Sequence, residues 1–133
     1  MAGSHCFISY STADGIDFAI RLHDALESGP PPIQSWVDKR DLRPGEDWEK
    51  QIVSAIQSCF AFVFVMTTDS VAYESVCRAE WSRALKYRKP IIPLLFDENV
   101  EPPLRLENHQ WIDFANDFDA GIAKPVSYTH LRA

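Results

Sequence analysis

The sequence predicts an α/β domain in which short apolar strands alternate with amphipathic helices around a parallel sheet. The chain has 133 residues, the size of one domain. The run Phe60–Val65 is continuously apolar, as in a strand buried on both faces. Stretches starting at Trp48 and Cys77 repeat apolar residues at i, i+4, i+7 and i+8, the spacing of amphipathic helices. We therefore expect a flavodoxin-like three-layer fold with a five-stranded parallel sheet in the order 2-1-3-4-5.

Short apolar runs bounded by turn residues predict the strands. In chain order these runs are His5–Tyr10, Ile33–Val37, Phe60–Val65, Ile91–Phe96 and Gln110–Phe114. Pro93 lacks a backbone N–H, so we expect its strand near an edge of the sheet.

Apolar spacing and capping residues predict the helices. The first helix covers Asp14–Ser28, with the side chains of Ser11–Asp14 as caps and Gly29 as its end. The second helix begins at Trp48, after a polar loop, Asp38–Asp47. The third helix is expected to be capped within Thr67–Ser70. Its core stripe is Cys77, Trp81, Ala84 and Leu85, and a last helix covers Ala115–Ala123.

Composition and charge exclude several classes of protein. Hydrophobic residues make up 46% and charged residues 24%, as in ordinary globular domains. The net charge of -6 disfavours binding to nucleic acid or to an anionic membrane surface. The longest apolar run, Cys59–Met66, is far shorter than the roughly 20 residues that span a bilayer. We expect neither a nucleic-acid partner nor a membrane.

The cysteine and histidine patterns indicate a reducing compartment and no metal. The three cysteines form no CxxC pair, and the four histidines lack ligand spacing. No charged segment followed by an apolar stretch opens the chain. A cytoplasmic location is therefore expected.

The segment Pro125–Ala133 breaks the α/β pattern. It resembles the translation of a transposon adapter used in sequencing libraries. The domain is therefore expected to cover residues 1–124, with its last helix truncated. We expect the natural chain to continue into further domains.

The carboxyl ends of parallel strands form the ligand crevice in such folds. This rule gathers Ser9-Tyr10-Ser11, the loop Asp38–Asp47 and the segment Thr67–Glu80 at one edge. The helical spacing places Glu80 beside the core stripe, at the boundary between core and crevice. By position alone, Glu80 is better explained as a surface glutamate paired with Arg83 at i+3 than as a ligand contact. Such a pair is worth ~0.2–0.5 kcal/mol.

Three motifs in order resemble the three boxes of a Toll/interleukin receptor (TIR) domain. They are His5–Tyr10, then Trp36–Asp38 running into Asp41–Gly45, then Ser75–Glu80. Ile91–Pro93 fits the fourth strand of that family, which tolerates the proline. The resemblance covers about residues 5–123, and the loop sequence RDLRPGEDW is similar to bacterial members.

The resemblance implies an enzyme. Many bacterial and plant TIR domains cleave the nicotinamide–ribose bond of NAD with a glutamate in the third helix, and Glu80 holds that position. NAD is then the substrate, and no cofactor is expected. Departure of neutral nicotinamide leaves an oxocarbenium-like ribose that one carboxylate can stabilise. The expected activity is that of an NAD glycohydrolase or cyclase, in bacterial immune defence or signalling.

The resemblance also implies the substrate contacts. These are Ser9, Tyr10 and Ser11 after the first strand, Asp38, Leu42 and Gly45 in the loop, and Tyr73 and Val76 near Glu80. The family often has Trp where this chain has Val76. We therefore expect Tyr73 to supply the aromatic surface for stacking. The loop Asp38–Asp47 corresponds to the BB loop, which packs against the next protomer and gates the pocket.

Three other functions remain as alternatives. A catalytically inactive TIR scaffold would act only by homotypic association, and Val76 in place of Trp favours it. A phosphoacceptor receiver domain needs an Asp at the end of the third strand, which here ends Val65-Met66-Thr67. A nucleoside deoxyribosyltransferase shares the fold and the glycosidic chemistry, but the BB-loop motif argues against it.

Overall fold

The computed structural model describes residues 5–29, 32–37, 48–72, 75–95, 100–101, 103–106 and 112–113. Within them lies a five-stranded parallel sheet in the order β2-β1-β3-β4-β5, which confirms the predicted fold class and strand order. The strands are β1 (Cys6–Ser9), β2 (Ser35–Val37), β3 (Ala61–Met66), β4 (Ile91–Leu95) and β5 (Ile112–Asp113). The helices are α1 (Ile16–Ser28), α3 (Trp48–Ser58) and α4 (Val76–Lys86), with a short 3-10 turn, η1 (Leu104–Leu106).

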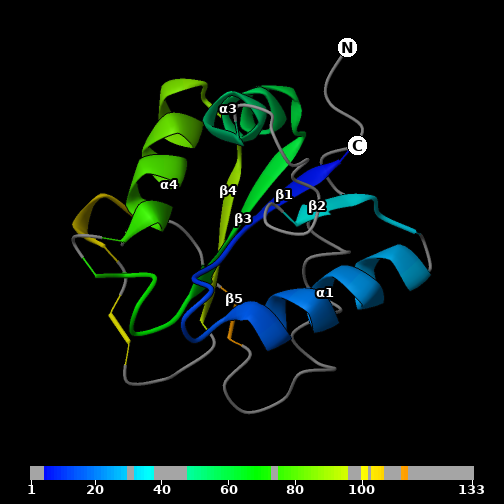
Figure 1. Ribbon diagram of the computed structural model, residues 1–133, viewed down its shortest axis with the longest axis horizontal. Coiled ribbons are helices and arrows are strands. Elements are labelled where there is room, and N and C mark those ends of the chain that lie inside the picture. The colour runs from blue at the N-terminus through cyan, green and yellow to red at the C-terminus, as the bar shows by residue number, and fades with distance from the viewer. Residues whose placement is uncertain are drawn as a thin grey trace.

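The helices cover both faces of the sheet, α1 on one side and α3 with α4 on the other (Figure 1). Side chains alternate along β1, so Cys6 and Ile8 join the α1-side core and Phe7 joins the α3/α4-side core. The central strand β3 is buried along its whole length. No helix in the described ranges is long and apolar enough to cross a membrane.

An aromatic ladder crosses the α3/α4 side of the sheet. Phe7 stacks on Trp36 of β2 at 5.1 Å and on Phe62 of β3 at 5.3 Å between ring centroids. Phe7 is the direct register partner of both other rings, so this row of stacked rings supports the pairing of three strands.

The predicted side-chain cap of the first helix is wrong. The N-cap residue of α1 is Gly15, which has no side chain to bond the helix. The hydroxyl of Ser11 instead accepts from the backbone N–H of Ala13 at 3.2 Å and donates to Asp69. The predicted helix end is confirmed, because Gly29 follows α1 with a positive φ of 63°.

The predicted cap of the third helix is also wrong. Helix α4 begins at Val76, and the hydroxyl of Ser75 accepts from the backbone N–H of Cys77 at 3.1 Å. Thr67 and Ser70 close a separate turn, in which each backbone N–H donates to the hydroxyl of the other residue, at 2.7 and 3.2 Å. The side chains offered as caps thus stabilise a turn ahead of the helix.

The expectation that Pro93 places its strand near an edge is confirmed, because β4 is the neighbour of the edge strand β5, although it is not itself the edge strand. Strand β4 lies between β3 and β5. The carbonyl of Pro90 accepts from Phe62 of β3, so Pro93, three residues on, faces the β5 side. Within the described residues, β5 pairs with Leu94 and Leu95. The ladder therefore tolerates a missing donor at this position.

The core stripe predicted on the third helix is confirmed, since Cys77, Trp81 and Ala84 are buried and Leu85 packs against them. The turn η1 was not predicted, and its Leu106 is also buried in the α3/α4-side core. The loop Asp38–Asp47, the expected helix Ala115–Ala123 and the segment 125–133 lie outside the described residues.

Candidate active site

A buried carboxyl group lies where α4 crosses the carboxyl end of β1. Oε1 of Glu80 accepts a hydrogen bond from the hydroxyl of Ser9 at 2.7 Å, across 71 residues of sequence. Glu80 is 3% exposed and Ser9 is fully buried. The sequence predicted Glu80 at the boundary between core and crevice, but the structure buries it more deeply than that.

The pleat of β1 explains why Ser9 reaches Glu80. Odd-numbered Phe7 and Ser9 project toward α3 and α4, whereas Ile8 and Tyr10 join the core beneath α1. Of the three contacts expected after the first strand, the structure brings Ser9 to Glu80 and buries the Tyr10 ring on the opposite face. Ser11 bonds Asp69 instead.

This hydrogen bond matters energetically, because a buried carboxyl group costs free energy unless it is hydrogen-bonded. A hydroxyl donating to a carboxylate makes one of the stronger bonds in proteins. The Arg83 guanidinium, the expected i,i+3 partner of Glu80, donates to the Tyr87 hydroxyl at 3.4 Å and lies over that ring. The contact between Glu80 and Ser9 therefore joins two elements of the fold and is more than a surface pair within one helix.

Glu80 lines a cavity of about 250 Å³ between α3 and α4. The remaining lining residues are Ala79 and Arg83 from α4 and Glu49, Ile52, Val53 and Ile56 from α3. The α3 wall is thus aliphatic apart from Glu49, and the α4 wall carries the carboxyl group of Glu80 and the guanidinium group of Arg83. The volume falls below the roughly 300–1,000 Å³ of typical ligand pockets.

A hydrogen-bonded clamp ties together two connections at the same edge of the sheet. The carboxylate of Asp14, after β1, accepts from the Thr67 hydroxyl at 2.6 Å and from the backbone N–H of Asp69 at 3.0 Å, both after β3. Asp69 in turn accepts from Ser11. Sequence reasoning missed this clamp. The signal available was that β1 and β3 are neighbours, so polar residues after both strands meet.

Several predicted site residues lie outside the described residues, namely Asp38, Leu42, Gly45 and Tyr73. Val76 is the first residue of α4, one turn before Glu80. Across the described ranges, no three His, Cys, Asp or Glu side chains cluster closely enough to hold a metal ion.

All three cysteines are free and buried. Burial raises the pKa of the Cys6 thiol from 9.0 to about 12. Burial likewise raises the pKa of Cys59 from 9.0 to about 11, with Lys89 acting in the opposite direction. At neutral pH both are protonated thiols that pack as small apolar side chains, and neither is a nucleophile for the site.

Solved structures share this fold. The TIR domain of the Toll-related receptor TRR-2 from Hydra magnipapillata superposes with a TM-score of 0.72 at 21% identity, covering 96% of this chain and 98% of that one. The TIR domains of the activated Roq1 resistosome give 0.72 at 15% identity, covering 98% and 99%.

A metazoan TIR-STING receptor from C. gigas, solved with 2',3'-cGAMP, gives a TM-score of 0.70 at 25% identity. The match covers 92% of this chain but 39% of that receptor. No curated protein matches the chain.

The family model described as TIR domain matches residues 6–126, nearly the whole chain. The superpositions with solved TIR domains cover nearly the whole of both chains, so the fold is shared. The chain therefore belongs to the TIR domain family, which includes NAD-cleaving enzymes as well as scaffold and signalling members.

Proposed function

We propose that this domain cleaves the nicotinamide–ribose bond of NAD, with Glu80 as the catalytic carboxyl group. The observation that carries the proposal is the position of Glu80. It is buried at the carboxyl edge of a parallel sheet, bonded by Ser9, and lines a cavity. Ligand sites of doubly wound folds occupy this edge. The products are nicotinamide and either ADP-ribose or a cyclic isomer, formed in the cytoplasm in bacterial defence or signalling.

The chemistry needs little from the protein besides a placed negative charge. The C1′–N bond breaks with its electron pair moving to the positively charged pyridinium nitrogen, so nicotinamide departs neutral. The ribose becomes oxocarbenium-like, and a carboxylate beside it stabilises that charge. Such stabilisation is strong where water is excluded, as at a group 3% exposed. Water then bonds to C1′ and loses a proton, or an adenine nitrogen attacks and closes a ring.

The cavity suits the nicotinamide end of the substrate. Ile52, Val53 and Ile56 supply an aliphatic wall for a flat ring. Ser9 holds one oxygen of Glu80 and thereby orients the carboxyl group. We propose further contacts by Ser11, Val76 and the main chain of Tyr10. Asp38, Leu42, Gly45 and Tyr73, all outside the described residues, complete the proposed set.

The test is incubation of the purified domain with NAD and identification of the products by mass spectrometry. Glu80→Gln keeps an oxygen that can accept from Ser9, so the fold should survive while turnover falls by about 10²–10³. Glu27→Gln is the matched control, because Glu27 is exposed on α1, across the sheet. Equal turnover in a well-folded Glu80→Gln protein would remove Glu80 from the mechanism.

A catalytically inactive scaffold is the second candidate function. TIR domains pair in a related solved structure, the RPS4 and RRS1 TIR domain heterodimer. We propose self-association through the segment 38–47, which would also complete a pocket that the described residues leave small. If the domain is an enzyme, its NAD-cleaving activity per molecule should then rise with protein concentration. Self-association without any NAD cleavage at high concentration would favour the scaffold.

A further inference from the structure

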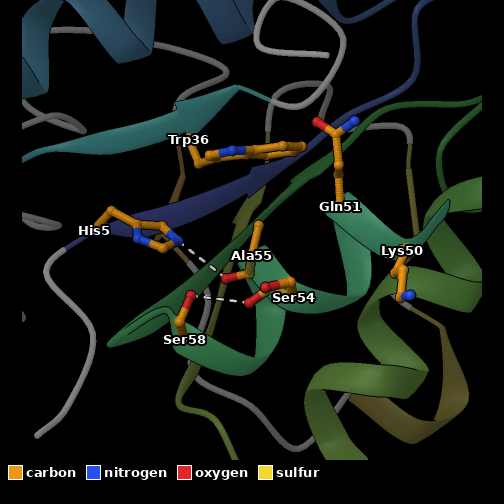
Figure 2. A pocket seen from close by; sticks show the side chains of 7 residues that line it. All are labelled: His5, Trp36, Lys50, Gln51, Ser54, Ala55 and Ser58. Atoms are coloured by element: carbon orange, nitrogen blue, oxygen red, sulfur yellow. Dashed lines mark hydrogen bonds between the residues drawn. The ribbon is translucent and has the colours of Figure 1, made fainter. Parts of the chain in front are cut away.

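Helices α3 and α4 both end at the amino edge of the sheet, a few residues before β3 and β4. At the end of α3, polar side chains bond within the molecule. The hydroxyl of Ser58 donates to the carbonyl of Ser54 at 2.9 Å, and Nε2 of His5 donates to the carbonyl of Ala55 at 3.0 Å (Figure 2). These four residues line a hollow of about 710 Å³ beside β2. Their hydrogen bonds are therefore part of the fold itself.

The end of α4 differs, because it presents positive charge to solvent. Lys86 and Arg88 are exposed, Lys89 is half-buried, and none of the three forms an ion pair with another described residue. The helix dipole favours a cation in the last turn, where Lys86 lies, but Arg88 and Lys89 lie beyond the helix. Tyr87 is half-buried and carries the Arg83 guanidinium over its ring. We call residues 86–89 the basic end of α4.

The backbone of Arg88 is strained. Its φ of 57° lies in the left-handed region, which glycine adopts freely at the ends of helices and which a residue with a Cβ atom adopts at a cost. Strain of this kind is concentrated at binding and catalytic positions. Glycine would suit this backbone better, so the charge of the Arg88 side chain is the feature that distinguishes the position.

The outer face of α1 has the opposite charge. Asp17 and Asp24 are exposed, lie about 10 Å apart along the helix axis, and form no ion pair with another described residue. Arg21 lies between them on the same face but already has a partner of its own. Beside Asp17, the large apolar side chain of Ile16 is 38% exposed. The face therefore combines free carboxylates with an exposed apolar side chain.

We propose that the basic end of α4 binds the α1 face of a second copy of this chain. The cations lie opposite Asp17 and Asp24, and the ring of Tyr87 lies against Ile16, so that a small apolar contact has a charged rim. The charges of the two surfaces are complementary, although the whole chain carries a net charge of -6. This surface is separate from the segment 38–47 proposed above for self-association.

The two surfaces of one molecule cannot meet, because α1 and α4 cover opposite faces of the sheet (Figure 1). The contact therefore joins different surfaces of two copies, and each copy keeps one free surface of each kind. Such a contact repeats head to tail and produces chains that grow with concentration.

The experiment is sedimentation velocity of the purified protein over a range of concentrations, in about 50 mM and about 500 mM NaCl. The protein should form dimers and larger chains that dissociate at the higher salt concentration. Arg88→Glu and Asp17→Lys should each weaken association by about tenfold or more. Mixing these two variants should restore association, because the intact α1 face of one meets the intact basic end of the other.

Arg105→Glu and Glu101→Lys are the matched controls. Both residues are exposed, and they follow β4 whereas the basic end precedes it, so they carry the same changes of charge at the opposite edge of the sheet. Neither variant should change association. A protein that stays monomeric at all concentrations, or variants that do not recover on mixing, would overturn the proposal.

Two other results would assign the association to a different contact and also overturn the proposal. One is association that survives both charge reversals and is lost in Gly45→Pro, which would place it at the segment 38–47. The other is a monomer that binds a poly-glutamate peptide through Arg88, which would indicate an acidic partner other than this chain. None of these outcomes depends on NAD being cleaved.

Discussion

The two faces of the sheet bury different kinds of group. Beneath α1, the strands contribute an apolar core in which Ile8, Val63 and Val65 meet Leu22 and Leu26. Beneath α3 and α4 an aromatic core continues to the carboxyl edge, where the buried pair Ser9 and Glu80 follows it. Alternate residues of one strand, β1, supply both faces. The difference shows that one face mainly stabilises the fold while the other also carries the proposed chemistry.

Truncation on the apolar face should separate stability from activity. Leu22 is fully buried beneath α1, so Leu22→Ala should cost about 2–5 kcal/mol of unfolding free energy by leaving a cavity. NAD turnover per folded molecule should not change. Urea denaturation and product analysis below the transition measure both quantities. A folded Leu22→Ala protein without activity would show that the faces are not separable.

Truncation within the buried pair of Ser9 and Glu80 should lower both the unfolding free energy and the NAD turnover. Ser9→Ala removes a donor from a buried carboxyl group, which should cost about 1–3 kcal/mol and lower turnover by about tenfold.

Ser35→Ala is the matched control for Ser9→Ala, since Ser35 is buried and bonds His23 of α1. It should lower stability and leave turnover unchanged. Parallel effects of the two serine variants on turnover would contradict a special role for Ser9.

The two buried thiols allow the two faces of the sheet to be compared through the pH dependence of the unfolding free energy. Cys6 lies in the α1-side core and Cys59 in the other, and their folded pKa values of about 12 and about 11 exceed the unfolded value of 9.0. Their stabilisation is complete below pH 9.0 and is lost as pH rises toward those values, because the unfolded state releases the proton first. Each thiol should contribute an average slope of about -1 kcal/mol per pH unit between pH 9 and 10, against a limit of about -1.4 for an unfolded thiol that is fully deprotonated.

Denaturation of wild type, Cys6→Ala and Cys59→Ala at several alkaline pH values measures these slopes. Each substitution should flatten the pH dependence, whatever its cost at neutral pH. Slopes that stay identical in all three proteins would show that these thiols do not titrate on unfolding.

Removing the hydrogen-bonded clamp at Asp14 should have the smallest effect on stability and turnover. Asp14 is exposed, so Asp14→Ala, which removes the acceptor for Thr67 and Asp69, should cost about 1 kcal/mol. Turnover should fall modestly, because the two connections beside Ser9 and Glu80 are no longer tied together. Asp24→Ala, on the exposed side of α1, is the control, and equal kinetics for both variants would limit the clamp to stability.

Local patterns determined the fold. The apolar run at Phe60–Val65 and the stripe Cys77, Trp81 and Ala84 predicted a central strand and a core-facing helix, and both are buried as expected. These features depend on spacing of 2 or 3.6 residues, which neighbours in sequence define. The motif match pointed to Glu80 for the same reason, since the motif is contiguous.

Tertiary structure decided the partners. The predicted cap of the third helix lay within Thr67–Ser70, but Ser75 caps α4 in the structure while Thr67 bonds Asp14, 53 residues away. Pro93 lies on β4 between two strands, and the described residues of β5 pair with Leu94 and Leu95, just beyond the proline. The burial of Glu80 against Ser9 depends on how α4 crosses β1, 71 residues earlier. Contacts over such separations follow from packing, so no local pattern in the sequence could specify them.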